Sequence, residues 1–272
     1  MKRWAFLILP VTALLTACGP APTLPSVPAP ATPEARTLTV FAAASLSEAF
    51  TEMGKNFEAA HPGVTVKFNF AGSQTLSTQL AQGAVADVFA SANHTEMDKL
   101  VAANLAAKDS PRDFLTNRLL VILPKDNPAH LQTLQDLERP GLKLVLADAS
   151  VPAGKYARQI LDNMSQDASF GSDFSRRVLA NVVSNETDVK QVVSKVQLGE
   201  ADAGMAYLSD AVAAPDLKTL DIPDNLNVIA RYPVAALSGA PQSQLAADFI
   251  AYVLSAEGQA ILKKWGFTPI TP

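Results

Sequence analysis

Four short turns in this sequence place hydroxyl groups or free backbone amides where a helix is predicted to begin. Ser45 is followed three residues later by Glu48, which is the spacing of a capping box. Ser73 is a predicted N-cap, and Gly72 before it lets the backbone approach a neighbour closely. Taken singly, each serine is better explained as an ordinary helix cap.

The other two turns offer backbone N–H groups. Pro152 suits the first position of a helix, which leaves the amides of Ala153 and Gly154 unpaired. The polar run 184–188 precedes Val189, where apolar residues begin to recur at helical spacing. A helix start carries unpaired N–H groups and the positive end of the helix dipole, so it can hold an anion without a counter-charge. The four turns together indicate anion binding.

Short β-rich runs alternate with segments of helical periodicity from Thr37 onward. The predicted strands cover residues 37–43, 64–70, 87–90, 119–123, 142–147, 204–207 and 226–230. The predicted helices include 131–137, 156–164, 174–179 and 189–196. This order is typical of an α/β fold with mainly parallel sheets flanked by helices. Ligands of such sheets bind beyond the carboxyl ends of the strands, which is where the four turns lie.

Side chains typical of catalysis are few. The three histidines, His61, His94 and His130, lie in turns or at helix ends, and none accompanies a Gly-x-Ser-x-Gly motif. The sequence has no P-loop, no Gly-x-Gly-x-x-Gly run and no His-Glu-x-x-His motif, and its scattered aspartates lack metal-ligand spacing. We therefore expect a binding protein without a cofactor or a bound metal cation, rather than an enzyme.

The composition fits about two globular domains. The chain has 272 residues, of which 48% are hydrophobic and 18% are charged, so a disordered chain is excluded. The formal net charge of −4 argues against nucleic-acid binding. A single cysteine, Cys18, cannot form an intramolecular disulfide.

The first 36 residues have the pattern of a targeting segment and a tether. Two basic residues precede an apolar stretch, 4–15, that is shorter than the roughly 20 residues of a membrane span, so we predict a cleaved signal peptide over residues 1–17. The run Leu-Thr-Ala-Cys ending at Cys18 resembles a bacterial lipobox, in which the cysteine is lipidated. An ordinary signal peptide with an incidental cysteine is the alternative. Residues 18–36 contain six prolines and are predicted to form an extended tether.

Between residues 38 and 267 the chain resembles the molybdate-binding proteins of bacterial molybdate ABC transporters. The resemblance rests on an ordered set of runs rather than on any one of them. These runs are VFAAASL at 40–46, ADVFASA at 86–92, VPAGKYA at 151–157, GMAY at 204–207, SDA at 209–211, YPV at 232–234 and WGF at 265–267.

The resemblance implies which residues form the site. In that family two hydroxyls, two backbone amides and one tyrosine hold the oxyanion. On this chain they correspond to Ser45, Ser73, Ala153, Val189 and Tyr207. The first four lie at the four helix starts identified above, and Ala92 is a further candidate for the pocket wall.

The resemblance also implies a two-domain periplasmic-binding-protein fold of type II with a two-strand hinge. Domain I would comprise residues 37–116 plus 233–272, and domain II residues 117–232. Ser45 and Ser73 would then face the other three site residues across a cleft, and the domains would close over the ligand.

The implied function is high-affinity extracytoplasmic binding of molybdate, and of tungstate, for delivery to an ABC importer. The partners would be a membrane permease and its cytoplasmic ATPase. The protein itself would be a monomer of the cell envelope, anchored to a membrane by its lipid and binding no nucleic acid. A fully deprotonated dianion needs hydrogen-bond donors only, whereas protonated phosphate would also need an acceptor.

Other functions stay open on the sequence. A binding protein of the same fold could carry sulfate or another tetrahedral oxyanion. A ferric-iron receptor fits less well, because that group commonly uses adjacent tyrosines and the four tyrosines here are isolated. A distant alternative from another class is an envelope serine hydrolase using Ser45, for which no motif supplies a base.

Overall fold

The computed structural model describes residues 35–270, which belong to one compact unit. The predicted signal peptide, the lipid attachment at Cys18 and the tether up to residue 34 lie outside the described residues. Within the described range, no single helix is long and apolar enough to cross a membrane. Helices α8 (Ser243–Leu254) and α9 (Ala256–Lys264) reach that length and composition only as a pair, and the chain bends by 63° between them.

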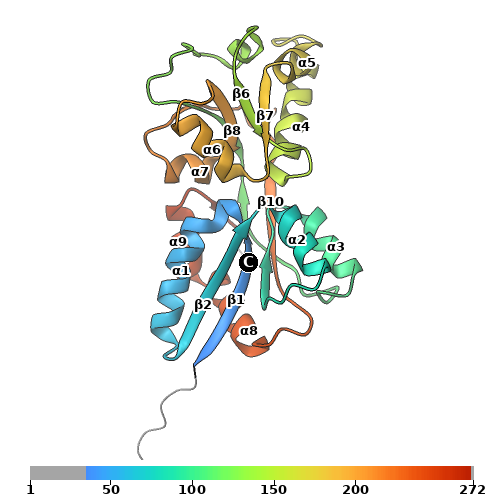
Figure 1. Ribbon diagram of the computed structural model, residues 1–272, viewed down its shortest axis with the longest axis vertical. Helices are drawn as coiled ribbons and strands as arrows, with labels where there is room; N and C mark the ends of the chain where they lie inside the picture. Colours follow the sequence, from blue (N-terminus) through green and yellow to red (C-terminus); the bar gives the residue numbers. More distant parts are fainter. Residues whose placement is uncertain (1–34, 271–272) are drawn as a thin grey trace, which may run out of the picture. The chain divides into compact units, whose positions relative to one another are not determined.

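Six strands form the first sheet, in the order β11-β4-β10-β3-β1-β2. They are β1 (Arg36–Ala43), β2 (Val64–Ala71), β3 (Val88–Ala90), β4 (Arg112–Asn117), β10 (Ala230–Ala236) and β11 (Thr268–Pro269). Strands β1 and β2 lie side by side in Figure 1. The helices α1 (Ser47–Ala60), α8 and α9 cover one face, and α2 (Ser73–Ala81) and α3 (His94–Ala102) cover the other. We call this sheet and its five helices the first lobe.

Strand β1 shows why helices cover both faces of this sheet. Val40 packs in the same core cluster as Phe50 of α1, whereas Phe41 packs with Leu76 of α2 and Met97 of α3. Successive side chains of a strand point to opposite faces, so a strand buried on both sides is apolar at consecutive positions. This explains the unbroken apolar run at the start of the folded chain.

Five strands form the second sheet, in the order β7-β6-β8-β5-β9. They are β5 (Leu119–Leu123), β6 (Leu144–Ala147), β7 (Val182–Glu186), β8 (Ala203–Tyr207) and β9 (Lys218–Leu220). The flanking helices are α4 (Pro152–Gln166), α5 (Phe174–Leu179), α6 (Val189–Gln197) and α7 (Leu208–Ala213). We call this sheet with its helices the second lobe.

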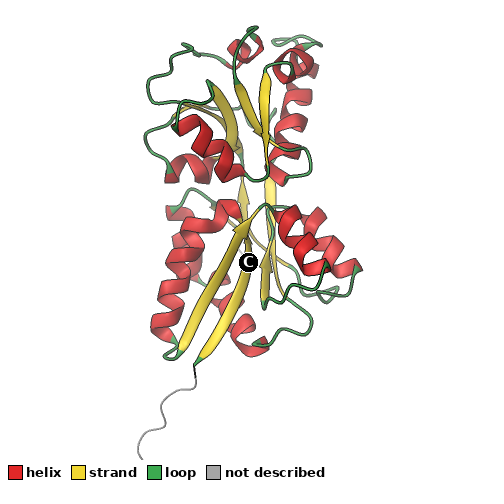
Figure 2. Ribbon diagram, viewed as in Figure 1, coloured by secondary structure: helices red, strands yellow, loops and turns green. Residues whose placement is uncertain are grey.

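The predicted α/β architecture, with helices flanking the sheets, is confirmed (Figure 2). The expectation of mainly parallel sheets is wrong, because both sheets are mixed and five of the nine described strand pairs are antiparallel. Strand β1 runs parallel to β2 and β3, and β6 runs parallel to β7 and β8. The remaining pairs are antiparallel and involve β4, β5, β9, β10 and β11. The parallel strands are the ones followed by the predicted site turns. Their carboxyl ends therefore lie together, as ligand binding at such an edge requires.

The chain passes between the two sheets twice. It leaves the first sheet at Asn117, enters the second at Leu119 and returns to the first at Ala230. The side chain of Asn227 ties the two passages together, because it accepts the N–H of Leu119 at 3.3 Å and donates to the carbonyl of Leu119 at 2.8 Å. The exact domain bounds set out above stay a prediction.

One predicted strand is wrong. Residues 226–229 form a turn and irregular chain, because two consecutive N–H groups there donate to the carbonyl of Pro223. Strand β10 begins only at Ala230. It contains Pro233, which cannot donate to a ladder, and its pairing with β4 shifts register between Tyr232 and Pro233. Because of Pro233 and this register shift, the strand lacks the regular alternation of apolar and polar residues by which strands are predicted from sequence.

Two other elements differ from their prediction. The predicted helix 131–137 is a short 3₁₀ helix, Leu134–Glu138, which begins with a capping box between Thr133 and Asp136. The segment predicted as a turn from residue 182 contains strand β7, which ends at Glu186. Exposure alternates along that strand, which is the pattern of an edge strand with one face exposed to solvent.

The start of α4 packs directly on the end of β6. A Cβ atom at Gly154 would overlap the carbonyl oxygens of Ala147 and Asp148. Only glycine allows this approach, which brings the first turn of α4 against the strand end.

Replacing this glycine should therefore destabilise the protein. Gly154→Ala is expected to lower the free energy of unfolding by about 1–3 kcal/mol, because backbone carbonyls cannot move aside as a flexible side chain can. Lys155→Ala, at the exposed next position, should change it by less than about 0.5 kcal/mol. Urea unfolding measures both variants, and an unchanged midpoint for Gly154→Ala would contradict the close packing.

Candidate functional site

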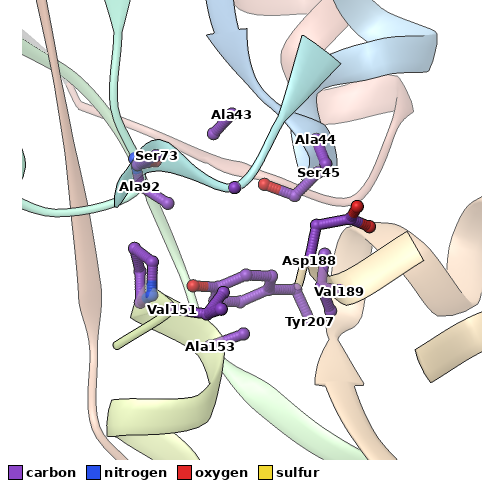
Figure 3. A pocket seen from close by; sticks show the side chains of 12 residues that line it. Ala43, Ala44, Ser45, Ser73, Ala92, Val151, Ala153, Asp188, Val189 and Tyr207 are labelled. Atoms are coloured by element: carbon purple, nitrogen blue, oxygen red, sulfur yellow. The ribbon is translucent and has the colours of Figure 1, made fainter. Parts of the chain in front are cut away.

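The turns that follow the parallel strands of both lobes line one pocket (Figure 3). Its lining residues are Ala43, Ala44, Ser45, Gly72, Ser73, Ala92, Val151, Pro152, Ala153, Asp188, Val189 and Tyr207. All five predicted oxyanion-binding residues and Ala92 are among them. The empty space among these residues is about 210 Å³ even when the open solvent at the mouth of the pocket is included, which is too little for an organic ligand of ordinary size. It therefore suits a small ligand.

Ser45 presents its hydroxyl group through a contact that the local sequence does not reveal. The predicted capping box with Glu48 is wrong, because α1 has Leu46 as its N-cap and no side-chain cap. Instead, the Oγ of Ser45 lies 2.9 Å from the hydroxyl of Tyr232, and both side chains are buried. When Tyr232 donates in this bond, the proton of Ser45 is free to donate to a ligand.

Ser73 also has a different local role from the predicted one. It is the first residue of α2, and Gly72 is the N-cap. The Oγ of Ser73 accepts the backbone N–H of Ala92 at 2.9 Å. Because this bond uses the oxygen as an acceptor, the hydroxyl proton of Ser73 is left to donate elsewhere. Both serines are thus prepared as donors by neighbours from other segments.

The two helix starts of the second lobe offer backbone amides. Pro152 occupies the first turn of α4, as predicted, and the N–H of Lys155 is the one that bonds to the carbonyl of Val151. The N–H of Ala153 therefore precedes the helical ladder. The N–H of Val189, the first residue of α6, is in the same position.

Asp188 lines the pocket, but its carboxylate is engaged with its own helix. It is the N-cap of α6, and it accepts the backbone N–H of Gln191 at 3.1 Å and the side-chain amide of the same residue at 2.7 Å. In Figure 3 the carboxylate points away from the hydroxyl of Tyr207. Its negative charge is therefore compensated locally at a helix N-terminus, where such a charge is favourable.

Tyr207 ends strand β8 and extends its ring into the pocket (Figure 3). Only 1% of the residue is exposed, and its hydroxyl has no hydrogen-bond partner within residues 35–270. Burial raises the pKa of this hydroxyl well above its usual range, so it stays protonated. Buried polar groups are almost always paired, since an unpaired one costs about 1–3 kcal/mol. Because it stays protonated and lines the pocket, this hydroxyl can donate a hydrogen bond to an acceptor there.

The pocket contains donors but no cation. None of its twelve lining residues is Lys, Arg or His. In the part of the chain that the structure describes, no group of His, Cys, Asp and Glu could hold a metal ion. Helix starts and hydroxyls therefore supply the positive potential, which fits a small anion and not a metal cation.

The three histidines lie outside this pocket. The ring of His61 contacts the carbonyl of Phe57, and His94 lies 2.7 Å from Asp113. His130 lies in a turn with a positive φ. The hydroxyl of Ser45 has Tyr232 as its partner rather than a base, so the pocket lacks the pair needed for nucleophilic catalysis.

Sequence reasoning missed Tyr232 and did not assign Asp188 to the pocket. Tyr232 lies in the Tyr-Pro-Val run that was noted for its resemblance, so a signal was present. Its partner Ser45 is 187 positions away along the chain, and no local spacing connects the two. Asp188 has the ordinary signature of an N-cap, which gives no sign that it also lines a pocket.

Comparison with known proteins places these features in a family. The sequence model of the family described as bacterial extracellular solute-binding protein matches residues 38–268. The molybdate-binding protein ModA of Mycobacterium tuberculosis is 42% identical over 257 residues, covering 93% of this chain and 92% of that protein. The putative ABC transporter substrate-binding lipoprotein YvgL of Bacillus subtilis is 29% identical and is aligned over 98% of each chain.

A solved structure shows the same fold. The substrate-binding domain of a putative molybdenum ABC transporter from Clostridium difficile matches with a TM-score of 0.64 at 29% identity, over 87% of this chain and 100% of that chain. The predicted periplasmic-binding-protein fold is thereby confirmed.

The family model covers nearly all of the described residues, and the high-identity relative covers most of the chain. The family consists of binding proteins that act outside the cytoplasm, not of enzymes, which removes the serine-hydrolase alternative. This chain belongs to the bacterial extracellular solute-binding protein family.

Proposed function

We propose that this protein binds molybdate in the pocket between its lobes and delivers it to an ABC importer. The observation that carries the proposal is the buried hydroxyl of Tyr207, which has no hydrogen-bond partner among the described residues and lies in a pocket whose described lining has donors and no cation. The 42% identity to a protein named for molybdate binding supports the choice of ligand.

Five donors would contact the oxyanion. They are the hydroxyls of Ser45, Ser73 and Tyr207 and the backbone N–H groups of Ala153 and Val189. A deprotonated dianion accepts from all five, whereas protonated phosphate would leave its own O–H group without an acceptor. Sulfate has the charge of molybdate but is smaller, so discrimination against it would depend on the fit of the pocket. Tungstate nearly matches molybdate in size and would bind as well.

Binding would join the two lobes. Ser45 and Ser73 belong to the first lobe, and the other three donors belong to the second. A ligand held by both lobes favours the closed arrangement, because it gains its full set of contacts only there. The predicted domains, 37–116 plus 233–272 and 117–232, would be the two moving bodies. The loaded monomer would then dock on a membrane permease that works with a cytoplasmic ATPase.

The thermal stability of the protein with different oxyanions tests the ligand directly. At a concentration of 100 times its dissociation constant, molybdate should add about 2.7 kcal/mol to the free energy of unfolding, and tungstate should act similarly. Phosphate should have little effect. Stabilisation by sulfate and not by molybdate would contradict the choice of ligand. The absence of any stabilisation would contradict oxyanion binding.

Removal of the Tyr207 hydroxyl should change the affinity for molybdate without changing the stability of the ligand-free protein. Tyr207→Phe should weaken molybdate binding by roughly tenfold to a hundredfold, because a hydrogen bond to a charged group is lost. It should not destabilise the ligand-free protein, since that hydroxyl has no partner there. Tyr252→Phe is the matched control, because its hydroxyl donates to Glu257 on the surface. Isothermal titration calorimetry measures both, and an unchanged affinity in Tyr207→Phe would remove this residue from the site.

We also propose that the protein is a lipoprotein attached through Cys18 after cleavage of residues 1–17, with 18–36 as the tether. The lipobox pattern and the alignment with YvgL, which is named as a lipoprotein, support this anchor.

The anchor is tested by fractionation of cells. Cys18→Ala should move the protein from the membrane fraction to the soluble fraction, because the thiol that carries the lipid is gone. Molybdate binding by the released protein should be unchanged, since residue 18 is far outside the matched range 38–268. Retention of Cys18→Ala in the membrane fraction would show that another feature anchors the chain.

A further inference from the structure

Three ionisable side chains lie in a row beside the pocket and connect the two lobes. Glu48 belongs to α1 of the first lobe, and Lys190 and Asp210 belong to α6 and α7 of the second. The Nζ of Lys190 lies 2.7 Å from Oε2 and 2.9 Å from Oε1 of Glu48, and 3.0 Å from Oδ1 of Asp210. One ammonium group therefore bridges carboxylates of both lobes.

Each member of this row is coupled to a segment that lines the pocket. Lys190 directly follows Val189 at the start of α6. Asp210 accepts the backbone N–H of Tyr207 at 3.2 Å. Glu48 lies in the first turn of α1, just beyond the first of the four site turns. A movement of the lobes would change the row and the pocket together.

The two halves of the row differ in burial. Asp210 is fully buried, whereas the side chains of Lys190 and Glu48 are 27% and 34% exposed. Burial opposes the charge of Lys190, but Asp210 and Glu48 outweigh it and raise the pKa of the ammonium group. Since Lys190 and Asp210 share one lobe, their contact would persist if the lobes separated. The contact with Glu48 is the one that opening must break.

A second contact shows that the lobes meet closely in this structure. The side-chain amide of Gln74 in α2 donates to the carbonyl of Thr187 at 2.9 Å. A Cβ atom at Gly72 would lie only 2.6 Å from the same carbonyl oxygen. The described arrangement is therefore a closed one, and the bridge through Lys190 is a property of that closed arrangement.

We propose that Lys190 is a positioning residue that holds the lobes closed by binding Glu48 and so slows the release of the bound anion. This inference rests on the proposed function, because closure acts on a ligand held between the lobes. Asp210 keeps the ammonium group in place before closure. The same ammonium group offsets the negative charge that Glu48 and Asp210 would otherwise place beside an anion site.

The test compares two substitutions on the same helix. Glu48→Gln removes the carboxylate charge that pairs with Lys190 of the other lobe. Glu52→Gln is the matched control one turn later, because Glu52 binds Lys264 and Trp265 at 2.8 Å within the first lobe. Stopped-flow mixing measures the association and dissociation rates of molybdate, and thermal melting confirms that both variants are folded.

Glu48→Gln should speed the dissociation of molybdate by roughly two- to fivefold, the range of a partly exposed ion pair, with little change in association. Glu52→Gln should leave both rates unchanged. Raising the ionic strength should bring the unmodified protein towards the dissociation rate of Glu48→Gln, because salt screens the bridge. A purely structural role of Glu48 would not produce this salt-dependent convergence.

Equal dissociation rates in Glu48→Gln and the unmodified protein would overturn the proposal, as would an equal acceleration in Glu52→Gln. If the unmodified protein does not bind molybdate, the proposed function fails instead. Small-angle X-ray scattering of the ligand-free proteins then tests whether the contact between Glu48 and Lys190 holds the lobes closed. A larger radius of gyration in Glu48→Gln supports it, and identical scattering profiles overturn it.

Discussion

A buried anion needs opposite charges or hydrogen-bond donors around it, and the described lining of this pocket provides donors and no cation. Two backbone amides come from helix starts, where the unpaired N–H groups and the helix dipole give a positive potential. Three hydroxyls complete the set. One of them, on Tyr207, is fully enclosed and has no partner among the described residues. An acidic protein with a net charge of −4 can therefore bind an oxyanion, because the attraction is local.

The rest of the fold serves to bring these donors together. The parallel strands of both sheets end at the pocket, and each site turn follows one of them. Contacts behind the pocket then fix the direction of the two serine hydroxyls. Tyr232 holds Ser45, and the backbone of Ala92 holds Ser73, so both hydroxyl protons remain available. Gly154 lets α4 begin against the end of β6. The bridge between Glu48 and Lys190 adds a link between the lobes that is separate from the donors.

Local patterns in the sequence predict the helix starts of the site to within a few residues but not what their polar side chains contact. Pro152 was placed correctly, because proline at a first helical turn depends only on backbone geometry. The capping roles of Ser45 and Ser73 were wrong, because distant neighbours take up these hydroxyls instead. Strand β10 was missed, since Pro233 and a register shift disturb its alternation. The convergence of the four turns follows from the topology of two sheets, which spacing along the chain does not encode.

The most direct test of the central claim is a crystal structure of the complex with molybdate, in which anomalous scattering locates the molybdenum atom. The account predicts one strong peak in the pocket between the lobes. The oxygens of the anion would lie within hydrogen-bond distance of the hydroxyl of Tyr207 and the N–H groups of Ala153 and Val189, with no Lys or Arg in contact. A peak outside the pocket, or an anion neutralised by a cationic side chain, would contradict it.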